Sequence, residues 1–354
     1  MKIIDRYIGR TVVGATATVL VVLLAIFSFF GFVDELQDIG PGGYGLPQVV
    51  LVVLLRLPGM TYDLLPIAAL IGSLIGLGGM MERNEIAVVR GAGVSRQRVV
   101  WSVMKGGAVV TVFAVLVGEF VFPPADREAR ELRGQTSSTR SSARTDRGFW
   151  ARDGNTYINI KEVLPDERFR GINILEFDDD KKLLRASHAE GAQYRDGRWR
   201  LTDIGQTDFT SGAPVARSLA GIDWDSLLDP TLINMVAINP DALSARDLVR
   251  YVRFVEGNGQ NAERWRHALW IKLAYPLAAA VMVYLSVPMV LTASRSVSSS
   301  RRILTGALIG LAFHIMNQTS RQLGIVFGVP AVLSALGPTA LLLGVSLFLH
   351  RRVR

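Results

Sequence analysis

The residue types that most often perform catalysis are sparse in this 354-residue chain. It has no cysteine, and it contains neither the metalloprotease motif H-E-x-x-H nor the nucleophile motif G-x-S-x-G. Its histidines show no metal-ligand spacing; they are His188, His267, His314 and His350. We interpret His314, with Asn317 and Gln318, as an interhelical contact, and an unrecognised enzyme site is the alternative. We therefore predict no catalytic residue, no metal site and no cofactor in this chain.

Nucleotide hydrolysis is also excluded for the chain on its own. None of its six lysines lies in the phosphate-binding motif G-x-x-x-x-G-K-[ST]. No segment expected on the cytoplasmic side is long enough for a nucleotide-binding domain. If ATP drives this protein, a separate subunit must bind and hydrolyse it.

A short charged segment at about residues 82–93 separates two apolar blocks. Residues 82–90 are predicted to form a helix with Ile86 and Val89 on one face. The charged side chains of the candidate contact surface are Arg83, Glu85 and Arg90. Two interpretations stay open, because the helix could dock into a cytosolic partner, or its arginines could only fix the orientation of the chain.

Long apolar blocks surround this segment. They cover residues 11–33, 46–81, 99–123, 268–294, 303–326 and 330–350, whereas residues 124–267 are typical of a soluble domain. A helix crosses the bilayer core with roughly 20 apolar residues, so we predict six transmembrane helices. The second block is too long for one straight span. Because Pro58 lacks an amide donor, we expect a span near residues 60–81, preceded by a tilted or interfacial segment at 46–58.

The distribution of arginine and lysine predicts the orientation. They cluster at the N-terminus, after the second and fourth apolar blocks, and at the C-terminus, whereas residues 34–48 and 327–330 contain none. We therefore expect both termini in the cytoplasm and residues 124–267 outside it. These arginines also explain much of the net charge of +8, so nucleic acid is not an expected partner.

The domain expected outside the cytoplasm, within residues 124–267, is predicted to consist of β-strands. Residues 156–160, 171–177 and 199–203 form β-branched or alternating runs, and turns are expected at residues 153–155 and 196–197. We predict an all-β domain of sandwich or jelly-roll type. Residues 244–257 should then form an amphipathic helix capped by Ser244, and residues 127–147 should be part helix and part linker.

Several short motifs, in order along nearly the whole chain, resemble one family. The chain is similar to the LptF/LptG lipopolysaccharide-export permeases. The matching motifs are DRYIG (5–9), FVD (32–34), LPIAAL (65–70), GLG (76–78), RNE (83–85), GAG (91–93), SVMK (102–105), GE (118–119), WARDGN (150–155), DALS (241–244) and GVP (328–330).

This resemblance implies a permease subunit of an ABC exporter in the inner membrane of a Gram-negative bacterium. Three transmembrane helices at 1–123 and three at 268–354 would enclose a periplasmic β-jellyroll at 124–267. The implied partners are an LptF-type permease, an LptB-type ATPase dimer that binds ATP and an LptC-type membrane-anchored jellyroll. Lipopolysaccharide would be taken from the membrane, through a cavity lined by the first and fifth helices, to a periplasmic bridge. The family's coupling glutamate, which contacts the ATPase, corresponds to Glu85.

The resemblance also implies substrate contacts. Arg130 and Arg133 match family positions implicated in lipopolysaccharide binding, and guanidinium groups bind phosphates through paired, charge-assisted hydrogen bonds. Being three residues apart, they would share a helix face. The alternative is a solvated linker, or salt bridges with Asp126 and Glu128.

The chain lacks the lysines that family members can carry near the end of the first helix and the start of the second. Those places hold Gly31, Gln37, Asp38 and Gly59. We expect Arg56 and Arg321 to supply phosphate contacts instead, with snorkelling or packing as the alternative. A membrane scaffold or sensor that transports nothing remains the alternative function.

Overall fold

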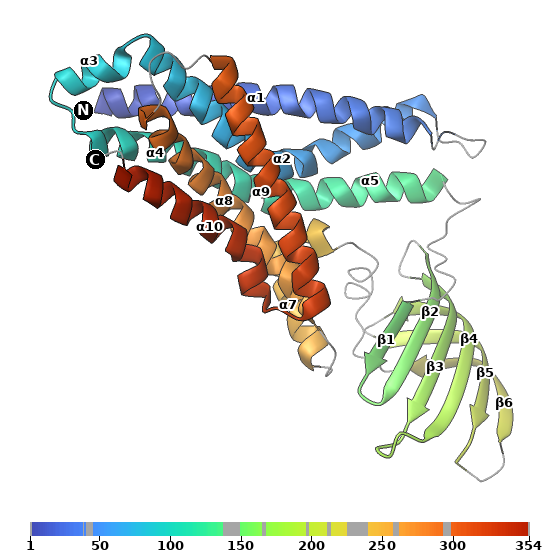
Figure 1. The fold of residues 1–354 in the computed structure, drawn as a ribbon. Coiled ribbons are helices and arrows are strands. Elements are labelled where there is room, and N and C mark those ends of the chain that lie inside the picture. Colours follow the sequence, from blue (N-terminus) through green and yellow to red (C-terminus); the bar gives the residue numbers. More distant parts are fainter. Residues whose placement is uncertain are drawn as a thin grey trace.

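The computed structural model combines a bundle of long helices with one antiparallel sheet that lies beside it (Figure 1). The structure describes residues 2–37, 39, 45–136, 149–164, 168–195, 198–210, 214–224, 240–257, 262–292 and 299–352. Both chain ends lie at the same end of the bundle, together with the short helix α3. We call this the connector end, and we call the opposite end, where α1 stops and α2 starts, the hairpin end.

The first half of the chain supplies five helices and a π-helical turn. In chain order these are α1 (Lys2–Leu36), α2 (Leu46–Glu82), α3 (Glu85–Gly91), α4 (Arg96–Leu116), the π-helical turn η1 (Val117–Val121) and α5 (Phe122–Thr136). The sheet follows, and the remaining helical elements are η2 (Pro240–Ala242), α7 (Ala245–Gly257), α8 (Glu263–Thr292), α9 (Ser299–Phe327) and α10 (Ala331–Arg352).

Five helical stretches among the described residues are long and apolar enough to cross a membrane. They are Ile3–Leu36, Leu46–Glu82, Arg96–Arg133, Glu263–Leu291 and Ala331–Arg352. The third of these joins α4, η1 and α5 into one continuous stretch. The helix α9 has a comparable length, but His314, Asn317 and Gln318 interrupt its apolar run. The chain is therefore a multi-pass helical membrane protein, and a sixth crossing by α9 stays a prediction.

The helix α2 forms the centre of the bundle. In its most apolar stretch 78% of the residues are buried, against 17% for α1. It runs without a break from Leu46 to Glu82 although Pro58 and Pro66 lie inside it. Residues 46–58, expected to be a tilted extension or an interfacial segment, are therefore the first part of this helix. Neighbouring helices allow membrane helices to tolerate proline, which explains the difference.

Glycines allow close contacts between α2 and its neighbours. A Cβ atom at Gly72 would lie 2.4 Å from the Cα atom of Thr16 in α1. On the other side of α2, a Cβ atom at Gly306 of α9 would lie 2.9 Å from Leu74, and one at Gly310 would lie 2.9 Å from Ile67. Small residues at helix interfaces are a common means of close packing in membranes.

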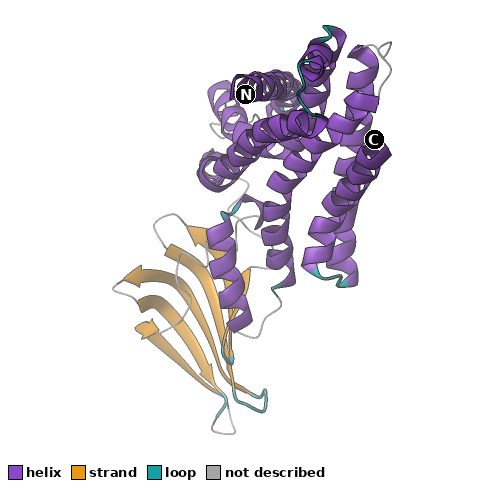
Figure 2. Ribbon diagram, turned by 90° about the vertical axis from the view of Figure 1, so that its left-hand side faces the viewer, coloured by secondary structure: helices purple, strands orange, loops and turns teal. Residues whose placement is uncertain are grey.

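The described residues of the inserted domain form a six-stranded sheet with the strands in sequence order. The strands are β1 (Phe149–Asp153), β2 (Thr156–Leu164), β3 (Arg168–Phe177), β4 (Leu183–Arg195), β5 (Arg198–Asp208) and β6 (Val215–Trp224). Figure 2 shows that the sheet curves strongly. One face carries its core, in which Phe169 and Trp199 pack with ring centroids 4.6 Å apart. The space left inside this core is about 10 Å³, less than one water molecule needs.

This order differs from the predicted jelly roll in one respect. Each described strand pairs antiparallel with its neighbour in the sequence, which makes a meander, whereas a jelly roll interleaves strands from two Greek keys. The turn expected at residues 153–155 is present, with Gly154 at φ 59°. The turn at residues 196–197 lies outside the described residues, but Arg195 pairs with Arg198 on its two sides.

Candidate functional sites at the two ends of the bundle

The connector helix α3 is a short helix of seven residues, about two turns, between α2 and α4. It starts at Glu85, three residues later than expected, because α2 continues to Glu82 and Asn84 adopts a left-handed conformation with φ 59°. Ile86 is buried, and Val89 packs against the same core of the bundle. The predicted apolar face is therefore present, and it holds α3 against the bundle.

Glu85 has two partners within the chain. The hydroxyl of Tyr7 in α1 donates a hydrogen bond of 2.9 Å to its Oε2, and Arg83 donates from Nε to its Oε1 at 2.5 Å. The hydrogen bond from Arg83 lowers the pKa of Glu85 below its ordinary value of 4.5. The side chain of Glu85 is 25% exposed, so this carboxylate is both held in place and accessible.

The outer face of α3 is open and mixed in character. Val88 is 70% exposed, which leaves an unusually accessible branched side chain on a short helix. Arg83 and Arg90 are also exposed, so cationic groups lie on both sides of Val88 along the chain. An exposed apolar side chain with flanking charges is suited to bind in a shallow cleft on a protein partner.

Ion pairs at the connector end join the long helices to one another next to α3. Arg302 of α9 is 6% exposed and donates from Nη1 to Glu82 at 3.0 Å, directly before the connector. Asp5 of α1 accepts hydrogen bonds from Ser102 and Lys105 of α4, each at 2.5 Å. The helix α3 thus contacts α1 directly through Tyr7 and Glu85 and follows α2 in the chain, while its link to α9 passes through Glu82 at the end of α2.

The hairpin end holds a buried carboxylate between two arginines. The side chain of Glu35, in the last turn of α1, has no exposed surface. Arg133 of α5 donates to both of its oxygens, from Nε to Oε1 at 2.7 Å and from Nη2 to Oε2. Arg56 of α2 donates from Nη1 to Oε2 at 3.1 Å. We call these three residues the Glu35 cluster; two of them, Arg56 and Arg133, were predicted substrate contacts.

The other two predicted contacts have different surroundings. Arg130 is exposed on α5 and donates to Asp126 at 2.6 Å, which is the salt bridge considered as an alternative from the sequence. Arg321 of α9 donates to Asp241 of η2 at 2.5 Å. The structure thus brings Arg56 and Arg133 onto one carboxylate, places Arg130 one helical turn away from Arg133, and engages Arg321 with the segment that returns from the sheet.

A polar junction that the sequence did not predict fixes this returning segment. Glu119 lies in the π-helical turn η1, and its carboxylate accepts hydrogen bonds from the backbone amides of Ala245 at 2.8 Å and Arg246 at 3.4 Å. These are unpaired amides of the first turn of α7, which a carboxylate satisfies well. Lys272 of α8 donates to the carbonyl oxygen of Leu243 in the same place. The junction joins α7, and with it the inserted domain, to the bundle.

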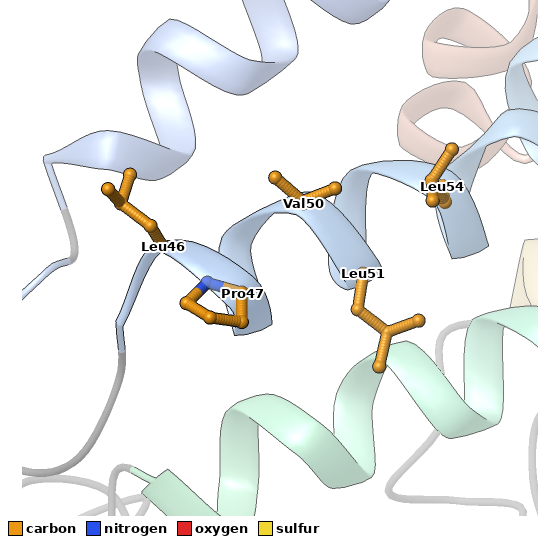
Figure 3. A pocket seen from close by; sticks show the side chains of 5 residues that line it. All are labelled: Leu46, Pro47, Val50, Leu51 and Leu54. Atoms are coloured by element: carbon orange, nitrogen blue, oxygen red, sulfur yellow. The ribbon is translucent and has the colours of Figure 1, made fainter.

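A shallow, open apolar groove runs along the first turns of α2. Its volume is about 500 Å³, and Figure 3 shows its five lining side chains on one side of that helix. They are Leu46, Pro47, Val50, Leu51 and Leu54. The opposite side of the same turns packs inward through Val49 and Val52, and Arg56 follows on that side. The start of α2 therefore presents an apolar surface outward and a cationic group inward.

The model of one protein family, described as lipopolysaccharide export system permease LptF/LptG, matches residues 6–352. The chain belongs to the LptF/LptG family. The match includes all the long helices, the connector α3, the inserted sheet and the Glu35 cluster.

Individual relatives agree with this assignment to the LptF/LptG family. The chain is 32% identical over 354 residues to the lipopolysaccharide export system permease protein LptG of Escherichia coli (strain K12), covering 99% of this chain and 98% of that protein. It is 30% identical over 353 residues to the LptG protein of Haemophilus influenzae (strain ATCC 51907 / DSM 11121 / KW20 / Rd), covering 99% of both.

Proposed function

We propose that this chain is the permease subunit of an ABC exporter that takes lipopolysaccharide from the inner membrane and passes it to a periplasmic bridge. The observation that carries the proposal is the family match from residue 6 to residue 352, which leaves no long helix and no described strand outside it. The proposed partners are an LptF-type permease, an LptB-type ATPase dimer that binds ATP, and an LptC-type jellyroll protein. In this topology both termini and α3 face the cytoplasm, and the sheet lies in the periplasm.

The exposed surfaces of α1 and α9 support a cavity shared with a second permease. The two helices lie on different sides of α2, and each carries large apolar side chains on the surface of the isolated chain. Examples are Phe29 and Phe30 of α1, which are 63% and 64% exposed, and Leu308 of α9 at 59%. If the partner permease pairs with this one, these walls accept acyl chains, and the α2 groove of Figure 3 adds to them.

The arginines at the hairpin end suit the phosphate groups of lipid A. Arg133 and Arg56 converge on one point at the level where α1 ends, and Arg130 lies one helical turn away on α5. Guanidinium groups bind phosphate through two parallel hydrogen bonds. We assign Arg133, Arg56 and Arg130 to headgroup binding, and Arg321, through its ion pair with Asp241, to anchoring η2.

The connector supplies the coupling to ATP hydrolysis. ATP-driven closure of the ATPase dimer moves α3 through Glu85, Val88 and the flanking arginines Arg83 and Arg90. Because Tyr7 binds Glu85 and Arg302 binds Glu82, this movement reaches α1 and α9, the helices that line the cavity. The cavity narrows, and lipopolysaccharide moves towards the inserted sheet.

The test is reconstitution with the partner subunits encoded in the same genome. The purified complex in liposomes should release lipopolysaccharide to a soluble periplasmic acceptor only when ATP is present, and the chain without its partners should hydrolyse no ATP. If the tagged chain purifies from membranes with no ATPase subunit, the proposal is wrong and the scaffold or sensor function is favoured.

Two variants locate the coupling contact within that assay. Glu85→Ala should reduce ATP-dependent release by about tenfold or more, while the chain still inserts into the membrane. The matched control is Glu176→Ala, which removes a partly exposed, ion-paired glutamate on the sheet. If both variants release lipopolysaccharide at the wild-type rate, Glu85 is not the coupling residue.

A further inference from the structure

The Glu35 cluster is built differently from the other ion pairs of the bundle. Its carboxylate has no exposed surface, whereas the side chains of Arg56 and Arg133 are 34% and 36% exposed. An apolar cluster from the same three helices surrounds it, namely Val49, Val52 and Ala129 with Phe32, Leu36, Leu55 and Leu132. An anion arriving from the surface therefore reaches the two guanidinium groups but not the carboxylate behind them.

Glu35 uses the donors that a phosphate group would use. Arg133 binds it with Nε and Nη2, which is the side-on, two-bond geometry that guanidinium groups offer to carboxylates and to phosphates alike. Arg56 adds Nη1 from the neighbouring helix. A buried carboxylate therefore occupies the place of an oxyanion between two arginines that come from different helices.

The charges of the cluster decide how strongly it attracts an anion. Two guanidinium groups and one carboxylate sum to a single positive charge. Because the carboxylate is buried and the arginines are only 34% and 36% exposed, water and salt screen these charges less than they would screen charges on the open surface. Without the carboxylate the same site would carry two positive charges. A lipid held by two unopposed arginines binds tightly and leaves slowly, which is unsuitable for an exporter.

We propose that Glu35 competes with the substrate phosphate for Arg56 and Arg133 and so limits how tightly this chain holds a phosphorylated lipid headgroup. The proposal rests on the export function proposed above. Binding of the headgroup shifts guanidinium hydrogen bonds from the carboxylate to the phosphate, and return of the arginines to Glu35 favours release. Arg56 is accordingly a phosphate-binding residue, and Glu35 is a positioning residue that acts through both arginines.

The decisive variant is Glu35→Gln, which keeps the size of the side chain and one oxygen acceptor but removes its charge. The complete complex with its partner subunits is placed in nanodiscs, and binding of purified lipopolysaccharide is measured before ATP is added. Half-maximal binding should need about tenfold less lipopolysaccharide than in the wild type, because one opposing charge is lost at contact distance. Release after ATP addition should slow by a similar factor.

Two further ligands show what the site binds. Lipopolysaccharide from which the lipid A phosphates have been removed should bind equally to the wild type and to Glu35→Gln. Inorganic phosphate in millimolar excess should not displace lipopolysaccharide from either protein if the headgroup of the lipid is the ligand. Displacement by inorganic phosphate would overturn the lipid assignment in favour of a site for free phosphate.

Asp34→Asn is the matched control, because Asp34 is the preceding residue and is exposed, and its loss changes the local charge by the same amount. It should leave the affinity within about twofold of the wild type. If Asp34→Asn and Glu35→Gln strengthen binding equally, the loss of any nearby negative charge explains the tighter binding of the anionic lipid, and the proposal is overturned. Weaker or unchanged binding in Glu35→Gln overturns it as well.

Arg56→Gln keeps the proposal testable if Glu35→Gln does not fold. This variant should bind phosphorylated lipopolysaccharide about tenfold more weakly and leave binding of the dephosphorylated lipid unchanged, and Arg56→Lys should restore part of the loss. Wild-type affinity of Arg56→Gln for the phosphorylated lipid would refute the role of Arg56. A wild-type complex that releases no lipopolysaccharide would instead refute the export function, so the two failures are distinguishable.

Discussion

The two ends of the bundle handle charge in different ways. At the connector end Glu85 is held by Tyr7 and Arg83, and a quarter of its side chain is exposed. At the hairpin end Glu35 is held by two arginines and is fully buried. Exposed ion pairs contribute little to stability, because water and salt replace them easily, whereas removal of one partner from a buried pair is costly. The connector can therefore exchange its partners for those of another protein at little cost, whereas at the hairpin end only the arginines are accessible and the buried carboxylate stays in place.

The largest expected effect is on stability at the hairpin end. Glu35→Ala leaves two cations without their shared carboxylate and should lower the free energy of unfolding by about 3 kcal/mol. Unfolding in mixed detergent micelles, followed by tryptophan fluorescence, measures it. Asp34→Ala, which removes the exposed neighbouring carboxylate, should change it by less than about 0.5 kcal/mol. Equal losses in both variants would remove the distinction between buried and exposed carboxylates.

A smaller effect is expected at the junction between η1 and α7. Glu119→Gln keeps an acceptor but removes the charge that binds the amides of Ala245 and Arg246, and it should cost about 1 kcal/mol. Hydrogen exchange of the first turn of α7 should accelerate, while exchange in β2–β5 stays as it was. Unchanged exchange at these two amides would show that the carboxylate does not anchor the helix.

The smallest effect is expected at the connector end. Glu85→Ala should change the free energy of unfolding by less than about 0.5 kcal/mol, because its partner Arg83 is 61% exposed and water readily replaces such an ion pair. The same substitution should nevertheless strongly reduce export, so at the connector end a loss of function is expected without a loss of stability. A stability loss comparable to that of Glu35→Ala would show that the two ends are alike.

Because Glu85 stays ionised, docking of the ATPase subunit should be insensitive to pH over the physiological range. Arg83 lowers the pKa of Glu85 below 4.5, so its charge is present above that value and is lost only as the pH falls through the lowered pKa. Copurification of the ATPase subunit should therefore be constant from about pH 8 to about pH 5. A decrease between about pH 6 and pH 5 that Glu85→Gln abolishes would contradict the lowered pKa.

Most of the fold could be predicted from local patterns. Apolar blocks of about 20 residues indicated the long helices, and β-branched runs with turn residues indicated the strands β2, β3 and β5. Ser244 was predicted to cap α7, and its Oγ does accept the amide hydrogen of Asp247 at 3.1 Å. The strand order was not predictable in this way, because alternation along a strand shows which face is buried but not which strand is its neighbour.

The candidate sites were predictable by residue type but not by partner. Arg56 and Arg133 were named from the sequence, yet Glu35 was not, although it lies next to Asp34 in a motif used for the family resemblance. The missing signal was available: Arg56 lies inside an apolar block, and a charge there requires a partner. Which carboxylate becomes the partner of Arg56 and Arg133 depends on how α1, α2 and α5 cross. Glu35 is 21 positions from Arg56 and 98 positions from Arg133 in the sequence, and no local pattern encodes a contact over such distances.

The π-helical turn η1 has a consequence for evolution by insertion and deletion. A π turn fits one additional residue into an otherwise α-helical stretch, and each residue of an α-helix advances the azimuth by about 100°. Loss of one residue between Val117 and Val121 would rotate everything beyond it, so that Arg133 would point away from Glu35 while every amino acid that forms the cluster was still encoded. The spacing of the backbone, and not only the identity of the side chains, thus decides whether the cluster can form.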